Sequence, residues 1–119
     1  MIITLAFPDA RLNPNRSKGK HWGATVALRK SAREQAFLLA KTACHGITFP
    51  MGMDVPIRIV FVQPDRRQRD RDNLLAAAKP MLDGVADALG VNDSQFQPVT
   101  IMREYGQKPG ATRIEIGGR

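Results

Sequence analysis

The stretch of residues 64–73 carries side chains suited to chemistry on a phosphate group. It reads P-D-R-R-Q-R-D-R-D-N, so four arginines alternate with three aspartates: Arg66, Arg67, Arg69 and Arg71 with Asp65, Asp70 and Asp72. The planar guanidinium of arginine presents several fixed N–H donors to a phosphate. Paired carboxylates supply the oxygen ligands that Mg²⁺ prefers. The combination predicts chemistry on a phosphodiester rather than phosphate binding alone.

Asp70 and Asp72 have a second interpretation, as residues that start a helix. Asp70 fits the N-cap position, and Asp72 fits the first turn, where a negative charge faces the positive end of the helix dipole. Capping alone does not require the surrounding arginines. We therefore favour both aspartates as metal ligands, with Asn73 as a polar neighbour.

A third carboxylate, Asp93, lies in the polar loop that follows the predicted helix. A helix of about eighteen residues spans roughly 27 Å, so Asp93 and Asp72 are expected at opposite ends of it. Either the loop folds back or a partner subunit brings the carboxylates together. The alternative for Asp93 is a structural Asx turn over residues 92–94.

Lys79 lies seven residues after Asp72 and projects from the same side of an ideal helix. It is expected either to form an exposed pair with Asp83, one turn further on, or to stabilise charge on a reacting phosphate. The residues alone favour the exposed pair.

A second basic stretch, residues 11–23, contains glycine, proline and asparagine and is predicted to be a loop. Arg16, Lys18 and Lys20 would grip a phosphate backbone, with His21 or Trp22 stacking on a base or sugar. The alternative is a solvated loop without a ligand.

The composition fits one soluble domain covering residues 1–119. The chain is 43% hydrophobic and 24% charged, and its formal net charge of +7 favours a polyanionic partner such as nucleic acid. The single cysteine, Cys44, excludes an intramolecular disulfide and is expected in the core. Because no signal peptide or membrane-spanning segment is expected, the predicted location is the cytoplasm.

The elements that must position these side chains follow the order β-α-β-α-β-β. Hydrophobic periodicity and turn residues predict strands at 1–7, 55–62, 98–105 and 112–116, and helices at 25–44 and 72–89. The last two strands are expected to form a hairpin. Pro80 is expected to kink the second helix or divide it in two, and Gly90 to cap it. The predicted fold is α+β, a mixed sheet with both helices packed on one face.

The chain resembles the RusA-type Holliday junction resolvases. The resemblance rests on residues 64–75, P-D-R-R-Q-R-D-R-D-N-L-L, followed by a helix and the V-N-D-S-Q loop at 91–95, and it extends over nearly the whole chain. It implies a small homodimeric, Mg²⁺-dependent endonuclease that cuts four-way DNA junctions. By position, Asp70, Asp72 and Asp93 resemble the acidic metal-binding residues of that family.

Two positions depart from the family pattern. Family members commonly carry a lysine four residues after the second aspartate, where this chain has Ala76, and often a second acid at the position of Asn92. Lys79, one turn further along, would substitute for that lysine. The departures either alter metal affinity or rate, or mark an inactive relative.

Together these features predict a DNA recombination and repair nuclease. Asp70, Asp72 and Asp93 would hold one or two Mg²⁺ ions, with Mn²⁺ as a substitute, and Lys79 would add positive charge at the reacting phosphate. The arginines of residues 66–71 and the basic loop would position four-way junction DNA on a homodimer. The alternatives are a non-catalytic basic nucleic-acid-binding module, in which the aspartates are only caps, and a ribosome-associated structural protein.

Overall fold

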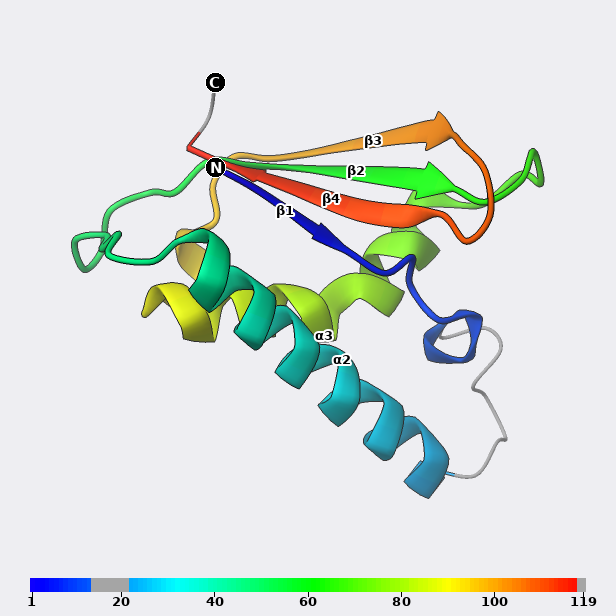
Figure 1. The fold of residues 1–119 in the computed structure, drawn as a ribbon, viewed down its shortest axis with the longest axis horizontal. Coiled ribbons are helices and arrows are strands. Elements are labelled where there is room, and N and C mark those ends of the chain that lie inside the picture. The colour runs from blue at the N-terminus through cyan, green and yellow to red at the C-terminus, as the bar shows by residue number, and fades with distance from the viewer. Residues whose placement is uncertain (14–21, 118–119) are drawn as a thin grey trace.

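The computed structural model describes residues 1–13 and 22–117, apart from the side chains of residues 22–24. Within these residues, four strands, two α-helices and two short 3₁₀ turns follow one another (Figure 1): β1 (Ile2–Leu5), η1 (Ala10–Leu12), α2 (Trp22–Ala43), β2 (Ile57–Gln63), α3 (Arg71–Leu89), η2 (Asp93–Gln95), β3 (Val99–Tyr105) and β4 (Ala111–Ile116). The predicted order of helices and strands is confirmed, with boundaries that differ by at most three residues.

The strands form one mixed sheet in the order β1-β4-β2-β3. β4 pairs antiparallel with both β1 and β2, whereas β2 and β3 run parallel. Both α-helices lie on the same side of this sheet, as Figure 1 shows. The α+β fold with helices on one face is therefore confirmed.

The expected hairpin between the last two strands is wrong. β4 lies between β1 and β2, and β3 forms the edge of the sheet on the far side of β2. The burial of the two strands gives the reason. Thr112, Ile114 and Ile116 of β4 are all buried, whereas nearly every side chain of β3 is exposed. The strand with alternate buried residues takes the interior position of the sheet, and the strand with exposed side chains takes the edge.

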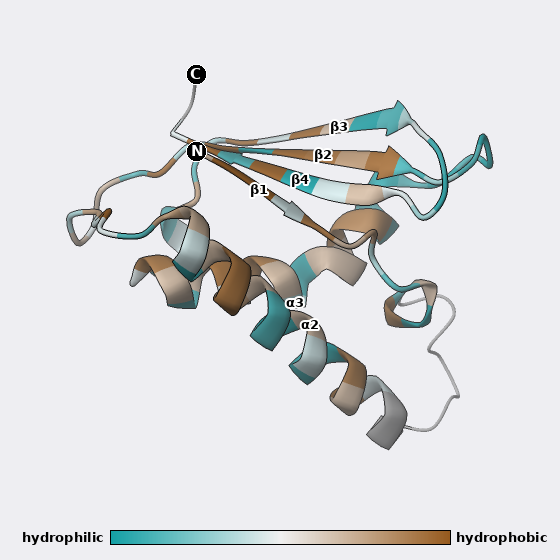
Figure 2. Ribbon diagram, viewed as in Figure 1, coloured by the Kyte–Doolittle hydropathy of each residue, from teal (hydrophilic) through white to brown (hydrophobic). Residues whose placement is uncertain are grey.

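The core lies between the sheet and the two helices. Alternate residues of β2, namely Ile57, Ile59 and Phe61, face the helices and are at most 3% exposed. On the partner strands, Ile3 and Ile114 extend the same apolar layer. Figure 2 shows apolar residues along the strands and on the helices beneath them, and a hydrophilic turn after β2. Cys44 is buried in this core, as expected.

The helix α3 is continuous from Arg71 to Leu89, with Pro80 inside it. The expectation that proline divides it into two helices is wrong, because packing holds the helix together: Pro80 and its neighbours Met81 and Leu82 are buried. Gly90 caps the helix in the left-handed conformation, with φ 69°, as predicted.

The two helices cross closely at Gly84 of α3. A Cβ atom at this position would lie 2.2 Å from the carbonyl oxygen of Arg33 in α2 and 3.0 Å from the Cβ atom of Ala36. Beside the crossing, the Arg33 guanidinium donates to both carboxylate oxygens of Asp87, at 2.8 and 3.1 Å. The position of α3 is thus set by contact with α2 as well as with the sheet.

Among the described residues, no helix combines the length and the apolar character needed to cross a membrane.

Candidate phosphodiester site

The turn between β2 and α3 is organised by Asp65. Its carboxylate accepts hydrogen bonds from the backbone N–H of Arg67 at 2.9 Å and from Nη1 of Arg69 at 2.9 Å. These bonds lower the pKa of Asp65 below its ordinary value, and the bond from Arg69 has the largest effect. The guanidinium of Arg69 also lies over the ring of Phe7, 5.3 Å from the ring centre. Asp65 therefore orders this turn, residues 64–70, which we call the arginine turn.

The end of β3 supports the turn from the other side. Arg103 Nη1 donates to the carbonyl oxygen of Arg69 at 2.6 Å, and Arg66 lies 5.5 Å from the ring centre of Tyr105. Sequence reasoning missed Arg103, because its contact joins segments thirty-four residues apart. The support comes from the parallel pairing of β2 and β3, which sets the ends of both strands side by side.

Beneath the turn, Gln63 is almost fully buried at 1% exposure. Its Nε2 atom donates to the carbonyl oxygen of Arg67 at 3.3 Å. Its Oε1 atom is buried and has no hydrogen-bond partner within the described structure. The amide thus ties the core strand to the arginine turn.

Asp70 is the N-cap of α3, as its helix-start interpretation predicted. Its Oδ1 atom accepts from the backbone N–H of Asp72 at 2.7 Å, and Asp72 lies in the first turn. Both residues are exposed. The cap engages one oxygen of Asp70, and the exposed carboxylates of both residues present acceptor oxygens at the surface. The two carboxylates are thus hard oxygen donors at the same helix start, a donor set that suits Mg²⁺.

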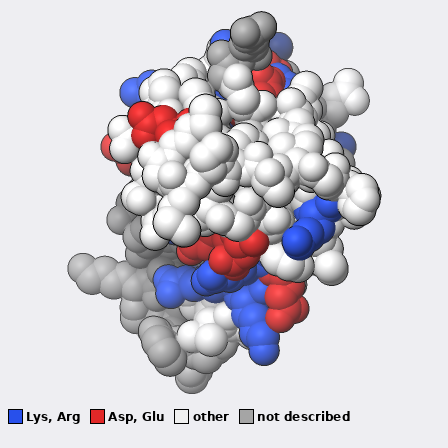
Figure 3. All heavy atoms as spheres, turned by 90° about the vertical axis from the view of Figure 1, so that its left-hand side faces the viewer, with Lys and Arg blue, Asp and Glu red and all other residues white. Residues whose placement is uncertain are grey.

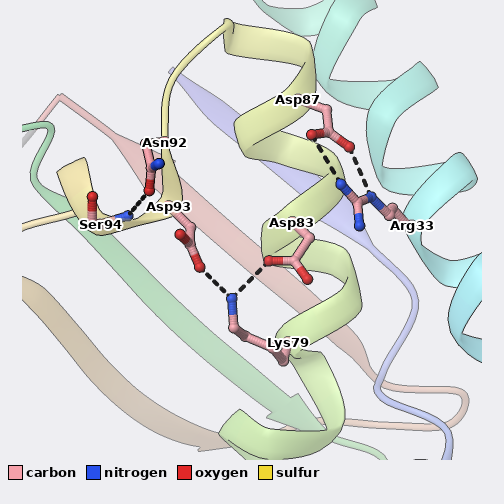
Figure 4. A network of polar contacts seen from close by, with 7 residues as sticks. All are labelled: Arg33, Lys79, Asp83, Asp87, Asn92, Asp93 and Ser94. Atoms are coloured by element: carbon pink, nitrogen blue, oxygen red, sulfur yellow. Dashed lines mark hydrogen bonds and ion pairs between the residues drawn. The ribbon is translucent and has the colours of Figure 1, made fainter. Parts of the chain in front are cut away.

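Asp93 lies at the other end of α3 and is held by Lys79 (Figure 4). Lys79 Nζ donates to Asp83 at 2.7 Å and to the carboxylate of Asp93. The Lys79–Asp83 pair was expected, whereas the contact with Asp93 was not. Both carboxylates raise the pKa of Lys79, and Asp83 has the larger effect. Lys79 in turn lowers the pKa of Asp93.

The loop that carries Asp93 is fixed by Asn92. Its side chain accepts from the backbone N–H of Ser94 at 2.9 Å, and Gln95 Oε1 accepts from the backbone N–H of Asn92 at 2.9 Å. The predicted Asx turn is therefore present. A hollow of about 410 Å³ opens beside this loop, and the Arg33–Asp87 pair lies on its far side.

Within one subunit, the described residues do not bring the three predicted metal ligands together. Asp70 and Asp72 lie at the start of α3, whereas Asp93 follows its end and reaches back to Lys79 at mid-helix. In residues 1–13 and 22–117, no group of three or more His, Cys, Asp or Glu side chains could hold a metal ion. Lys79 is likewise engaged by Asp83 and Asp93.

The basic loop predicted from the sequence lies mostly outside the residues that the structure describes. Arg16, Lys18, Lys20 and His21 fall within residues 14–21, and the side chain of Trp22 is also not described.

The end of the molecule seen in Figure 3 differs in character from the arginine turn. The figure shows a broad area without charged side chains above a zone where acidic and basic residues alternate. The loop between α2 and β2 reaches this end of the fold in Figure 1, and it exposes Ile47, Met51 and Met53. The chain therefore offers different surfaces at its two ends.

Comparison with known proteins finds a relative that matches nearly the whole of this chain. The chain is 34% identical over 117 residues to an uncharacterized protein of Xylella fastidiosa (strain Temecula1 / ATCC 700964), and the match covers 98% of this chain and 75% of that protein. No protein-family model matches the chain.

Proposed function

This chain belongs to the same family as the Xylella fastidiosa protein, and we propose that it is a Mg²⁺-dependent endonuclease that cuts four-way DNA junctions. One observation carries the proposal. Two exposed carboxylates, Asp70 and Asp72, share a helix start directly after a turn of arginines that is held in place by Asp65 and Arg103. Phosphate-binding cations and metal-binding oxygens thus lie side by side.

The arginine turn would position the DNA backbone. Arg69 is oriented by Asp65 and Phe7, and Arg66 is oriented by Tyr105, so both guanidinium groups are partly preorganised. Arg67 and Arg71 are exposed and add further positive charge. Contacts with phosphates fix register without reading bases, which suits recognition of a branched shape.

Asp70 and Asp72 would hold the Mg²⁺ ion or ions, or Mn²⁺ in their place. A bound metal ion of this kind activates water for attack on phosphorus and stabilises the leaving oxygen. Asp70 keeps its cap bond to Asp72 while its carboxylate faces solvent, so the helix start fixes the spacing of the two ligands. The free N–H groups of that first turn favour an anionic phosphate nearby.

Asp93 would join the site from a second copy of the chain. β3 forms an edge of the described sheet, begins just after η2 and ends beside the arginine turn. Antiparallel pairing of two copies through β3 would therefore place the Asp93 end of each copy beside the Asp70 end of the other. A homodimer built in this way would carry two sites, one for each of two opposed strands of a junction.

Lys79 would serve this arrangement by holding Asp93 until the site is formed. Its Nζ atom lies between Asp83 and Asp93, as Figure 4 shows. Once Asp93 is taken up as a ligand of the second copy, the Lys79 ammonium would keep its bond to Asp83 and offer its remaining N–H donors to a phosphate.

The test is cleavage of a labelled four-way junction and of a matched linear duplex, with and without Mg²⁺. Wild-type protein should cut the junction only, in symmetric pairs of nicks and only with metal. Asp70→Asn should reduce the rate by at least a hundredfold without unfolding the protein, because asparagine is an equally good N-cap. The exposed carboxylate of Asp54 offers the matched control: Asp54→Asn should cut at the wild-type rate. Tight junction binding without cleavage under any metal would refute the nuclease.

A non-catalytic nucleic-acid-binding module is the second candidate. It is favoured by the structural roles that the aspartates already have: Asp70 caps α3, and Asp93 pairs with Lys79. This protein would bind DNA or RNA equally well with Mg²⁺ or a chelator present. Asp70→Asn would leave its binding unchanged.

A further inference from the structure

A hollow of about 330 Å³ opens directly beside Asp70. It lies between the segment that follows β1, the arginine turn and the first two turns of α3. Its apolar lining comes from Phe7, Pro8, Leu74 and Ala77, and we call it the Asp70 hollow. This volume lies at the lower end of the range that holds small organic ligands.

The polar lining of the Asp70 hollow offers both acceptors and donors, because the guanidinium groups of Arg67 and Arg69 line it beside the carboxylates. The carboxylate of Asp9 and the amide of Asn73 join Asp70 in the lining. Arg11 donates two side-chain hydrogen bonds to Asp9 at 2.8 and 3.1 Å and lowers the pKa of this carboxyl, so it stays ionised. Asp9 therefore presents a charged acceptor to a ligand inside the hollow.

Two arginines, Arg67 and Arg69, line the hollow, and Arg69 is engaged by its neighbours. The guanidinium of Arg69 is paired with Asp65 at 2.9 Å and lies over Phe7. Only 19% of the Arg69 side chain is exposed. The Asp70 hollow thus combines an apolar, partly aromatic wall with hydrogen-bond acceptors, and the exposed Arg67 adds a guanidinium to its lining.

We propose that the Asp70 hollow takes an unstacked nucleobase of the DNA next to the phosphate held at Asp70 and Asp72, which rests on the proposed function. A base is flat and largely apolar on its faces, and enzymes that extrude bases hold them between apolar side chains. Carboxylate and asparagine oxygens accept from the exocyclic amino groups of cytosine, adenine and guanine, which thymine lacks. Base pairs at the branch of a junction lose stacking on one side, so extrusion costs least there.

A base held in the Asp70 hollow gives the nuclease a base preference at one position beside the cut. Asp9 and Asn73 would set that preference, whereas the arginines would act on any sequence. The Asp9–Arg11 pair would keep the Asp9 carboxylate in place when the hollow is empty.

Ala10 allows the hollow to be filled without touching the metal ligands. It lines the hollow and is exposed, so Ala10→Phe should project into the space and leave the fold intact. Ala43 is an exposed alanine at the end of α2, so Ala43→Phe is the matched control.

The first measurement is an NMR titration of the whole protein with the four deoxynucleoside monophosphates and with inorganic phosphate. Amide signals of Asn73 and Ala77 should shift with the adenine, cytosine and guanine nucleotides, and much less with the thymine nucleotide or phosphate. The shifts should disappear in Ala10→Phe and persist in Ala43→Phe. Equal shifts with inorganic phosphate, or unchanged shifts in Ala10→Phe, would overturn the base pocket.

The second measurement is junction binding in metal-free buffer, with an abasic residue placed in turn at each position around the branch. Wild type and Ala43→Phe should lose affinity on the order of tenfold at one position, the loss expected for one stacked base. Ala10→Phe should bind intact and abasic junctions equally. Nucleotide shifts without junction cleavage would refute the proposed function and keep the pocket. Cleavage with no nucleotide shifts and no abasic effect would refute the pocket alone.

Discussion

Gly84→Ala should destabilise the protein, although alanine is the better helix former. The new Cβ atom would lie 2.2 Å from the Arg33 carbonyl oxygen and 3.0 Å from the Ala36 Cβ atom. Since non-bonded heavy atoms prefer about 3.5 Å, α2 and α3 would have to separate by roughly 1 Å. Overpacking of this kind costs about 1–3 kcal/mol. Replacing glycine within a helix regains about 1 kcal/mol. The net expected loss is up to about 2 kcal/mol, and we expect the upper part of this range because the obstacle is backbone and cannot rotate away.

Urea unfolding of wild type, Gly84→Ala and Ala76→Gly measures this effect. Ala76 is exposed on the same helix, so Ala76→Gly reports helix propensity alone and should cost about 1 kcal/mol. The sign of the Gly84→Ala change is decisive. If propensity acted alone, Gly84→Ala would stabilise the protein by about as much as Ala76→Gly destabilises it. A stabilised Gly84→Ala variant would therefore refute the close crossing of α2 and α3.

Two further predictions concern the turn before β4 and the pair at Asp93. Gly110→Ala should cost about 1–2 kcal/mol in the same unfolding assay, because Gly110 has φ 78° and its Cβ atom would lie 2.8 Å from the Val62 carbonyl oxygen; wild-type stability would contradict this geometry. The Lys79–Asp93 pair makes the stability of the protein depend on pH. The lowered pKa of Asp93 adds stability that is present above the ordinary pKa of this carboxyl and is lost as pH falls through the lowered value. The raised pKa of Lys79 adds stability that is lost as pH rises through the raised value. In thermal unfolding followed across acid pH, Lys79→Met should flatten the acid limb of the profile, and an unchanged limb would contradict the pairing.

Local features of the fold were accessible from sequence because they depend on neighbouring residues. Asp70 starts α3 through a bond to the N–H two residues on, and Gly90 ends it with positive φ. Both follow from side-chain chemistry within one turn. The alternation that predicted β2 likewise reflects a single buried face.

Strand order was not accessible in the same way, because pairing joins distant segments. A tight loop between β3 and β4 favoured a hairpin, yet β4 lies beside β1 and β2. The signal was present in the alternation of Thr112, Ile114 and Ile116, which are all buried in β4. The contacts of the arginine turn with Phe7 and Arg103 depend on this order and were missed for the same reason.

The pair between Lys79 and Asp93 bears on whether Asp93 can serve as a metal ligand at all. The two side chains are 51% and 47% exposed, and exposed ion pairs contribute at most about 1 kcal/mol. Lys79 also keeps Asp83 as a partner when Asp93 leaves, so the lysine is not left unpaired. Releasing Asp93 is therefore a small cost beside the attraction between a carboxylate and a divalent cation. The structural role of Asp93 in one subunit does not argue against a catalytic role in a pair of subunits. The nuclease, unlike the binding module, requires Asp93 to lie close to the start of α3. A second copy of the chain would bring the two together.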